Sequence, residues 1–223
     1  MNKMSKKIIK IHDFEDRLKR KIRRHFKSLG YTVNHNELIT PILTKENIRK
    51  LHSKQKKEKL IKKKNFLNRI KPEIYNYFAD GTDICPEKIK PRLEIVRAST
   101  KEADLFRLAG LTWSVPVSEG YGRRIRFLVW DDYNGKLMGL LAITDPSIGS
   151  GPRERFIGWD KKTKDKNLVY LMDAHIVGAI APYNQILCGK LIACLLKTRE
   201  IKDIFNKKYK NKVGYISEIK KNP

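Results

Sequence analysis

Residues 123–144 read RRIRFLVWDDYNGKLMGLLAIT, and this stretch decides the fold class of the chain. Two runs of apolar, β-branched and aromatic residues flank the sequence Asp131-Asp132-Tyr133-Asn134-Gly135. An Asn-Gly pair between such runs is a strong hairpin signal, because both residues accept the positive φ angles of tight hairpin turns. Asp131 and Asp132 are then interpreted as turn formers. The stretch therefore predicts two antiparallel strands of one sheet.

The segments around this hairpin predict further strands and helices. Residues 92–98 alternate like a strand, and 99–113 predict a helix in which Ser99 and Glu102 have capping-box spacing. Residues 145–155, rich in Gly and Pro, predict a loop. Residues 168–182 predict the longest strand and 183–196 a helix, before a basic helix at 199–209 and a short VGYIS segment. This order predicts an α+β or mixed α/β fold, with a mixed sheet flanked by helices.

The N-terminal part of the chain predicts basic helices. Residues 13–30 place apolar side chains at helical spacing, with Asp13 at the predicted start and Gly30 at the predicted end. A second helical region runs from Thr44 to Ile70, and turn signals follow up to residue 91. The sequence therefore predicts a basic helical region at 1–80 and a core domain at 81–223.

The net charge of +25 is concentrated at the two ends of the chain. Residues 1–75 hold 23 Lys and Arg against 7 Asp and Glu, residues 76–196 hold 17 against 14, and residues 197–223 hold 9 against 3. A nearly neutral core between basic ends is typical of a domain held on a polyanion, although a lysine-rich surface that is merely solvated gives the same composition. We expect DNA to contact the following residues: Lys19, Arg20, Arg23, Arg24, Lys27, Lys62, Lys63, Lys64, Arg123 and Arg124.

Other features of the composition point to a reducing cytoplasm. No apolar run approaches the roughly 20 residues that a membrane-spanning helix needs, and the basic N-terminus lacks the apolar core of a secretory signal. Cys85, Cys188 and Cys194 form an odd set without metal-ligand spacing, and each is interpreted as a small core residue. We therefore expect neither a metal site nor a membrane partner.

The order of elements in the core resembles that of the GNAT acetyltransferase fold. The resemblance implies a pyrophosphate at the N-terminus of the helix that follows 168–182, where unpaired N–H groups and the helix dipole favour an anion. The GNAT motif, aligned from Asn184, places Leu187 and Gly189 at its glycine positions, and only Gly189 fits. Lys190 could reach an anion at the same place. A coenzyme A-type cofactor is therefore possible but disfavoured, and a weak anion site is the expectation.

A closer resemblance covers nearly the whole chain. Residues 111–146, 153–160, 171–191 and 205–209 (FNKKY), with 51–57, 77–91 and 104–111 upstream, resemble the DruA family of the Druantia anti-phage defence system. The resemblance implies antiviral defence or a mobile-element setting, work on DNA, and other defence proteins as partners. Family members usually continue past SEIKKNP with a strand and a polar segment. We therefore expect the family's C-terminal segment to be lacking here, together with the strand that it would add beside 168–180.

Several polar residues of the core are candidates for chemistry. Asp145 ends a strand at an Asp-Pro pair, and its carboxylate either points into a cleft or caps the loop. Asp173 and His175 share a strand face by the period of two, so they are either a general base pair or a buried, mutually satisfied pair. Arg123 and Arg124, with Tyr121, either hold a phosphate or form a solvated strand end.

Two functions fit these residues. In the first, a nucleobase enters a cleft near Asp145, Asp173, His175 and Tyr183 and receives a group, as in a GNAT-like nucleic-acid-modifying transferase. In the alternative, the protein is a non-enzymatic DNA-binding subunit of a defence or transposition complex. Leu187 at a glycine position and the lacking C-terminal segment both favour the alternative.

Overall fold

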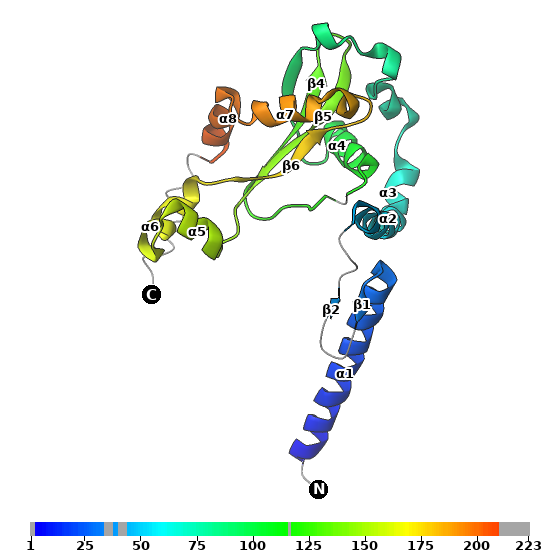
Figure 1. Cartoon of the computed structure of the whole chain (residues 1–223), viewed down its shortest axis with the longest axis vertical. Coiled ribbons are helices and arrows are strands. Elements are labelled where there is room, and N and C mark those ends of the chain that lie inside the picture. Colours follow the sequence, from blue (N-terminus) through cyan, green and yellow to red (C-terminus); the bar gives the residue numbers. More distant parts are fainter. Residues whose placement is uncertain (1–2, 34–37, 40–43, 116, 210–223) are drawn as a thin grey trace. The chain divides into compact units, whose positions relative to one another are not determined.

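The computed structural model describes residues 3–33, 38–39, 44–115 and 117–209 (Figure 1). The chain divides into two compact units. The first unit comprises Met1–Asn68 with Ser114–Pro116, and the second comprises Arg69–Trp113 with Val117–Pro223. The VGYIS segment lies outside the described residues.

The first unit is largely helical. It contains α1 (Lys3–Leu29), α2 (Lys45–Lys62) and nearly all of α3 (Lys64–Arg69), and the short strands β1 (Thr32–Val33) and β2 (Leu38–Ile39) pair antiparallel. Thr44 caps α2, because its Oγ1 accepts a hydrogen bond from the Asn47 N–H at 3.2 Å. The prediction of helices in this part of the chain is confirmed.

The C-terminus of α1 forms a Schellman motif at Gly30. Gly30 has a φ of +95°, and its N–H donates to the Lys27 carbonyl at 3.0 Å. The Tyr31 N–H donates to the Phe26 carbonyl at 3.1 Å, and the two rings pack edge to face with centroids 5.7 Å apart. The predicted helix end is confirmed. The predicted start is wrong, because α1 begins ten residues before Asp13, which instead pairs with Arg17 at 2.9 Å.

The second unit is built on one antiparallel sheet. Strands β3 (Pro91–Ile95), β4 (Arg124–Asp131), β5 (Lys136–Thr144) and β6 (Asp173–Ala179) lie in the order β3-β4-β5-β6. The predicted hairpin is confirmed: Asp131 pairs with Lys136, and Gly135 turns the chain with a φ of +70°. All three pairings among these four strands are antiparallel, and the parallel pairing in the described part of the chain is the isolated bridge between Phe78 and Leu137 of β5, so the four strands do not form the mixed sheet that the sequence suggested.

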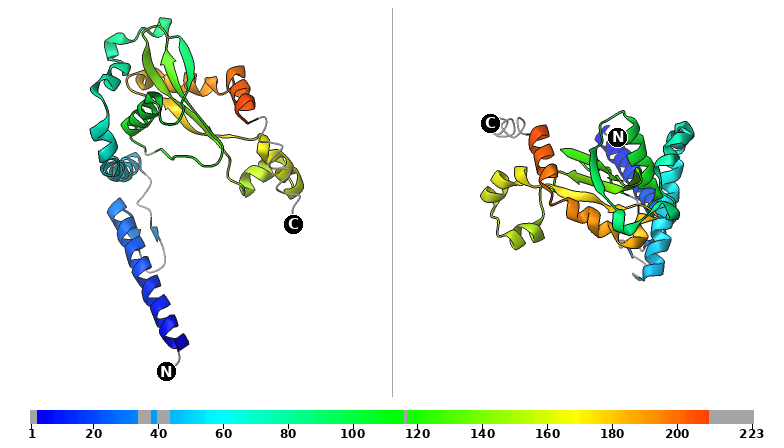
Figure 2. Two further views of the ribbon diagram at one scale, coloured as in Figure 1. Left: turned by 180° about the vertical axis from the view of Figure 1, so that it is seen from behind. Right: turned by 90° about the horizontal axis from the view of Figure 1, so that it is seen from above.

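Helices flank this sheet, and the α+β class is confirmed. They are α4 (Lys101–Thr112), α5 (Gly151–Ile157), α6 (Lys161–Asn167), α7 (Cys188–Leu195) and α8 (Arg199–Tyr209). Short 3-10 turns occur at Pro72–Tyr77, Gly81–Asp83, Pro86–Lys88, Leu168–Tyr170 and Tyr183–Ile186. Figure 2 shows α4 and α7 on opposite faces of the sheet.

The core lies over the two central strands. Leu140 and Leu141 are both fully buried although neighbouring side chains of a strand point to opposite faces, so both faces of β5 are covered. One face packs with Ile192 of α7 and Ile201 of α8 in a single buried cluster. On the other face Leu140 lies beside Gly110 of α4.

Several predicted boundaries are wrong for identifiable reasons. Thr100 rather than Ser99 caps α4, because the Thr100 Oγ1 accepts the Ala103 N–H at 3.4 Å. The strand predicted at 168–182 is shorter, since 168–170 form a 3-10 turn and β6 begins at Asp173. The predicted helix at 183–196 begins only at Cys188. The predicted loop at 145–155 contains the first residues of α5, where Pro152 stands at a position that helices tolerate.

A close approach of helix to sheet occurs at Gly139 and not at Gly189. A Cβ at Gly139 of β5 would overlap Cδ1 of Ile192 on α7 and crowd the Gly178 carbonyl oxygen of β6. A Cβ at Gly189 would meet no atom within 4 Å. Gly139 is therefore the glycine that lets α7 lie on the sheet.

We predict opposite effects of adding one methyl group at these two glycines. Gly139→Ala forces α7 away from β5 and should lower the free energy of unfolding by about 1–3 kcal/mol. Gly189→Ala meets open space within a helix and should raise it by up to about 1 kcal/mol. Urea denaturation followed by circular dichroism measures both. Equal effects of the two substitutions would contradict this account of helix packing.

Candidate functional site

The polar residues at the end of β5 form a tight group that we call the strand-end cluster: Tyr121, Arg123, Thr144, Asp145 and His175. Its centre is an ion pair in which the Arg123 Nε lies 2.7 Å from the Asp145 Oδ1. The backbone N–H of Arg123 donates to the Asp145 Oδ2 at 2.7 Å, and the Arg123 Nη1 donates to the Val169 carbonyl at 2.7 Å. Both carboxylate oxygens are thus engaged, and Asp145 joins the start of β4 to the end of β5.

Aromatic residues of α8 cover this ion pair. The Arg123 guanidinium carbon lies 5.4 Å from the Phe205 ring centroid and 5.8 Å from that of Tyr209. The Tyr209 hydroxyl lies 2.9 Å from the backbone N of Arg124, from which it accepts, and 3.0 Å from the Arg124 carbonyl oxygen, to which it donates. The side chain of Arg123 is only 13% exposed. The Arg123 side chain is therefore packed between α8 and the strand end, where its contacts hold the two together.

The loop before β4 needs glycine at two positions. Gly120 and Gly122 have φ angles of +67° and +61°, which other residues rarely adopt. A Cβ at Gly120 would lie 2.9 Å from the His175 Nε2, and one at Gly122 would overlap the Asp145 carboxylate. Thr144 fixes the same loop, because its hydroxyl accepts the Tyr121 N–H at 2.9 Å and donates to the Tyr121 carbonyl.

His175 is the member of the cluster with an unused polar atom. Its Nδ1 is buried and has no hydrogen-bond partner among the described residues. Burial and the neighbouring positive charge of Arg124 lower the pKa of His175. The side chain is therefore held neutral near neutral pH.

Asp173 and His175 do not form a hydrogen-bonded pair within the described part of the chain. Thr144 pairs with Asp173 and Ile143 with Ala174, but Ala142 pairs with Ile176, so His175 is the extra residue of a bulge. A bulge interrupts the alternation on which the prediction of a shared strand face depends. Asp173 is exposed, whereas His175 is partly buried.

Tyr183 belongs to a separate network at the other end of the sheet. Its hydroxyl lies 2.9 Å from the Asp131 Oδ2 and 2.8 Å from the Asn134 Nδ2, and both Tyr183 and Asp131 are fully buried. Burial, with the Asp131 carboxylate, raises the pKa of Tyr183. Asp131 pairs with Lys136, the first residue of β5, and Asp145 directly follows Thr144, the last residue of that strand. At the rise of a β-strand, about 25–30 Å therefore separates Asp131 from Asp145. The structure does not bring Tyr183 together with Asp145 and Asp173.

The start of α7 departs from the pyrophosphate motif at Leu187. Leu187, at the position of a motif glycine, adopts a left-handed conformation with a φ of 61° and is 70% exposed. Its carbonyl already accepts the Lys190 N–H at 3.0 Å, and its side chain makes no cap hydrogen bond. Asn184 lies in the 3-10 turn before the helix, Gly189 is the second helical residue, and Lys190 is exposed.

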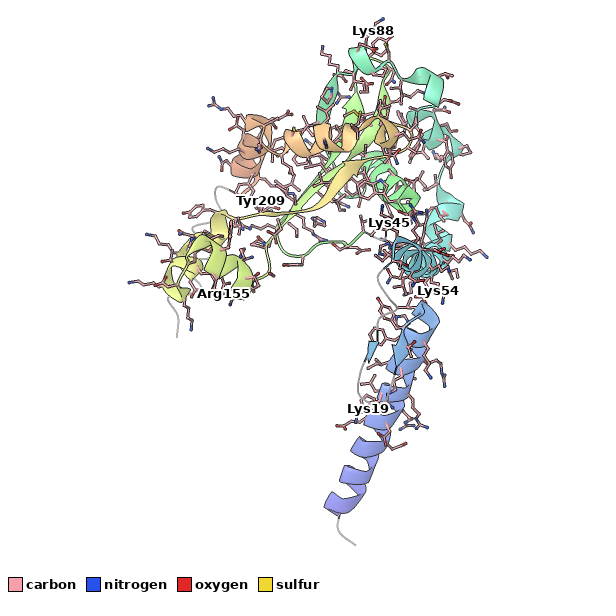
Figure 3. All side chains as sticks on the ribbon, viewed as in Figure 1. Lys19, Lys45, Lys54, Lys88, Arg155 and Tyr209 are labelled. Carbon is pink, nitrogen blue, oxygen red and sulfur yellow. The ribbon has the colours of Figure 1, made fainter. Side chains whose placement is uncertain are left out.

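The candidate DNA-binding residues of the first unit are exposed, except Lys63, which is partly buried. Lys19, Arg20, Arg23, Arg24 and Lys27 are all exposed on α1, whose apolar residues Phe14, Leu18 and Ile22 are also 62%, 44% and 46% exposed. Lys62 ends α2, Lys63 is its C-cap and Lys64 begins α3. Figure 3 labels Lys19 on α1, with Lys45 and Lys54 on α2.

Sequence reasoning did not foresee the buried network of Asp131, Asn134 and Tyr183 or the exposure of two cysteines. The sequence marked Asp131 and Asn134 only as residues of a hairpin turn. An Asp in a turn gives no sign that its carboxylate will be buried and bonded to a distant Tyr183. Cys188 is buried as predicted and its pKa is raised by burial, but Cys194 is exposed and Cys85 only partly buried. Within 3–33, 38–39, 44–115 and 117–209, no group of three metal-ligating side chains occurs and no helix is long and apolar enough to cross a membrane.

The class of protein that these features define is an α+β domain on a four-stranded antiparallel sheet, joined to a basic helical unit. The family model described as Druantia protein DruA matches residues 42–222, which is more than half of the chain, and the chain belongs to this family. A Druantia protein DruA from Escherichia coli (strain UMEA 4076-1) is 48% identical over 222 residues, which cover 99% of this chain and 55% of the relative. The chain thus spans about half the length of that relative. No solved structure matches the chain.

We predict that the hydroxyl of Tyr183 stabilises the fold. Tyr183→Phe leaves the buried Asp131 carboxylate with one hydrogen bond fewer, and the free energy of unfolding should fall by about 1–3 kcal/mol. Tyr170→Phe is the matched control, because Tyr170 is 70% exposed. Urea denaturation of both variants measures the difference. A Tyr183→Phe variant as stable as the control would refute the role of the network.

We predict that His175 makes stability depend on pH. Its pKa in the folded protein lies below that in the unfolded chain, so its contribution is present above about pH 6.5 and is lost as the pH falls below that value. His175→Gln should therefore flatten the fall in the free energy of unfolding between pH 7 and pH 5. His25→Gln, on the exposed surface of α1, is the control. Parallel pH profiles for wild type and His175→Gln would contradict the assignment.

Proposed function

We propose that this DruA-family protein contributes DNA binding to anti-phage defence, and that the contact is mainly electrostatic and resides in residues 1–75. The observation that carries the proposal is the charge of α1. From residue 17 to residue 29 the helix has no acidic residue, and its basic residues are Arg17, Lys19, Arg20, Lys21, Arg23, Arg24 and Lys27. Dense cations on a helix suit backbone phosphates, which carry most of the affinity of DNA-binding proteins but no sequence information.

The exposure of these cations supports the same proposal. Every basic residue of this part of α1 is exposed, and the acidic residues of the helix lie before it at Asp13, Glu15 and Asp16. This segment is about 20 Å long at the rise of an α-helix, so its charges match several successive phosphates of a duplex. A membrane surface is less well matched, because the apolar stripe of α1 contains no Trp.

A DNA-binding role fits the second unit better than group transfer does. The Asp145 carboxylate that a transferase would use as a base is held in place by Arg123, whose backbone N–H and Nε each donate to one of its oxygens. Tyr183 is buried at the opposite end of the sheet, and Leu187 stands where the first motif glycine would let the cofactor approach. We therefore favour a non-enzymatic subunit of a defence complex, with other proteins of that system as partners.

The proposal predicts a steep salt dependence that substitutions on α1 reduce. Replacing Lys19, Arg20, Arg23 and Arg24 together by Gln should weaken binding to a 20-base-pair duplex and lower the slope of log affinity against log salt by up to about 0.9 for each lost phosphate contact. Fluorescence anisotropy across a salt series measures the slope. The control replaces Lys161, Lys162, Lys166 and Lys190, which are exposed residues of the second unit, by Gln. Equal slopes for the two quadruple variants would exclude α1 as the DNA contact.

A further inference from the structure

A basic groove lies in the second unit where β3 ends, β4 begins and α8 packs. Its volume is about 680 Å³. Apolar side chains form part of its lining, including Ile95, which is 39% exposed, and Ile204. The charged side chains of the lining are all cationic: Arg97, Arg124, Arg126, Lys207 and Lys208.

Contacts between α8 and β4 hold the groove in shape. The Lys208 Nζ donates to the Arg124 carbonyl at 2.7 Å, and the Tyr209 hydroxyl bonds to the backbone of the same residue. The Arg124 Nη1 donates to the Glu119 carbonyl at 2.9 Å, which fixes the guanidinium while leaving most of its donors available. The positions of Arg124 and Lys208 in the groove are therefore fixed by hydrogen bonds within the second unit.

The positive charge in this groove is not neutralised by carboxylates of its own lining. Arg97 and Lys207 are exposed, and neither side chain makes an ion pair among the described residues. Burial lowers the pKa of Arg126, the charges of Arg124 and Arg107 lower it further, and the Glu119 carboxylate outside the lining acts in the opposite direction. An anion bound in the groove would add negative charge beside cations that the lining itself does not balance.

The chemistry of the groove favours a phosphodiester over a nucleoside triphosphate with its metal. Within the part of the chain that the structure describes, no group of three acidic, His or Cys side chains could hold a metal ion. The lining lacks glycine and offers cations on three separate elements, which suits consecutive phosphates of a strand better than one compact polyphosphate. The exposed Ile95 provides an apolar contact for a sugar or base edge.

We propose that this groove binds the phosphate backbone of a nucleic-acid strand, as a second contact distinct from α1. This proposal rests on the proposed function in one respect, that the ligand is a nucleic acid. The groove and α1 are different surfaces of different units. Arg97 and Lys207 contact phosphates directly, and Arg124 and Arg126 form the fixed cationic floor.

The first test removes two exposed cations of the groove from the full chain. Arg97→Gln with Lys207→Gln should lower the slope of log affinity against log salt by roughly 1.4 for a single strand or 1.8 for a duplex. The control is Lys161→Gln with Lys190→Gln, which removes the same charge elsewhere in the unit. Both pairs are measured alone and in the background of the α1 quadruple variant. A lower slope in both backgrounds supports the groove as a contact whether or not α1 binds DNA. A slope equal to that of the control pair overturns the proposal.

The second test locates the strand without relying on affinity. The photoreactive residue benzoylphenylalanine replaces Ile95 in the groove or, as a control, Ile148, which is 76% exposed outside it. The expected result is crosslinking of a labelled oligonucleotide from residue 95 and not from residue 148. Equal crosslinking from both, or none from 95, overturns the proposal. Sodium pyrophosphate that binds the groove by calorimetry without any oligonucleotide crosslink would likewise overturn it in favour of free phosphates.

Discussion

The buried carboxylate of Asp131 joins three segments of the second unit that are far apart in the sequence. Its Oδ1 accepts the Lys90 N–H at 3.0 Å, just before β3, and the Tyr133 N–H at 3.1 Å within the hairpin turn. Its Oδ2 accepts the hydroxyl of Tyr183, which follows β6. A carboxylate removed from water is costly unless its oxygens are hydrogen-bonded. The three donors must therefore meet at one point, which sets the register of β3 against β4 and the place where the chain turns toward α7.

The two ends of the sheet use polar residues in similar ways. At the hairpin end, Asp131 ties the turn to the strands around it. At the opposite end, Asp145 uses both oxygens on Arg123, and the aromatic rings of α8 close over the guanidinium. In both cases the hydrogen bonds of the carboxylate join a strand end to neighbouring segments of the chain. Of the strand-end cluster, His175 alone keeps a buried polar atom without a partner among the described residues.

The parts of the fold that follow local rules were predictable from the sequence. The hairpin of β4 and β5 follows from Asn134-Gly135, and the end of α1 follows from Gly30, because each needs a positive φ that few residues accept. The start of α7 was not predictable in this way, since Leu187 takes a left-handed conformation that its residue type disfavours. The bulge at His175 could not be predicted from the sequence either. Tertiary packing sets both, and no local pattern reports it.

The arrangement of charges in the second unit was also not predictable from the sequence alone. Residues 76–196 are nearly neutral in sequence, and of the five cationic residues that line the groove only Arg124 was expected to contact DNA. Folding separates these charges, because acidic residues such as Asp131, Asp145 and Glu94 are engaged in hydrogen bonds while Arg97, Arg124 and Arg126 converge with two lysines of α8. A count along the chain averages over this separation. The groove exists because strand pairing places residue 97 near residue 126, and the packing of α8 on the start of β4 brings residues 207 and 208 beside them.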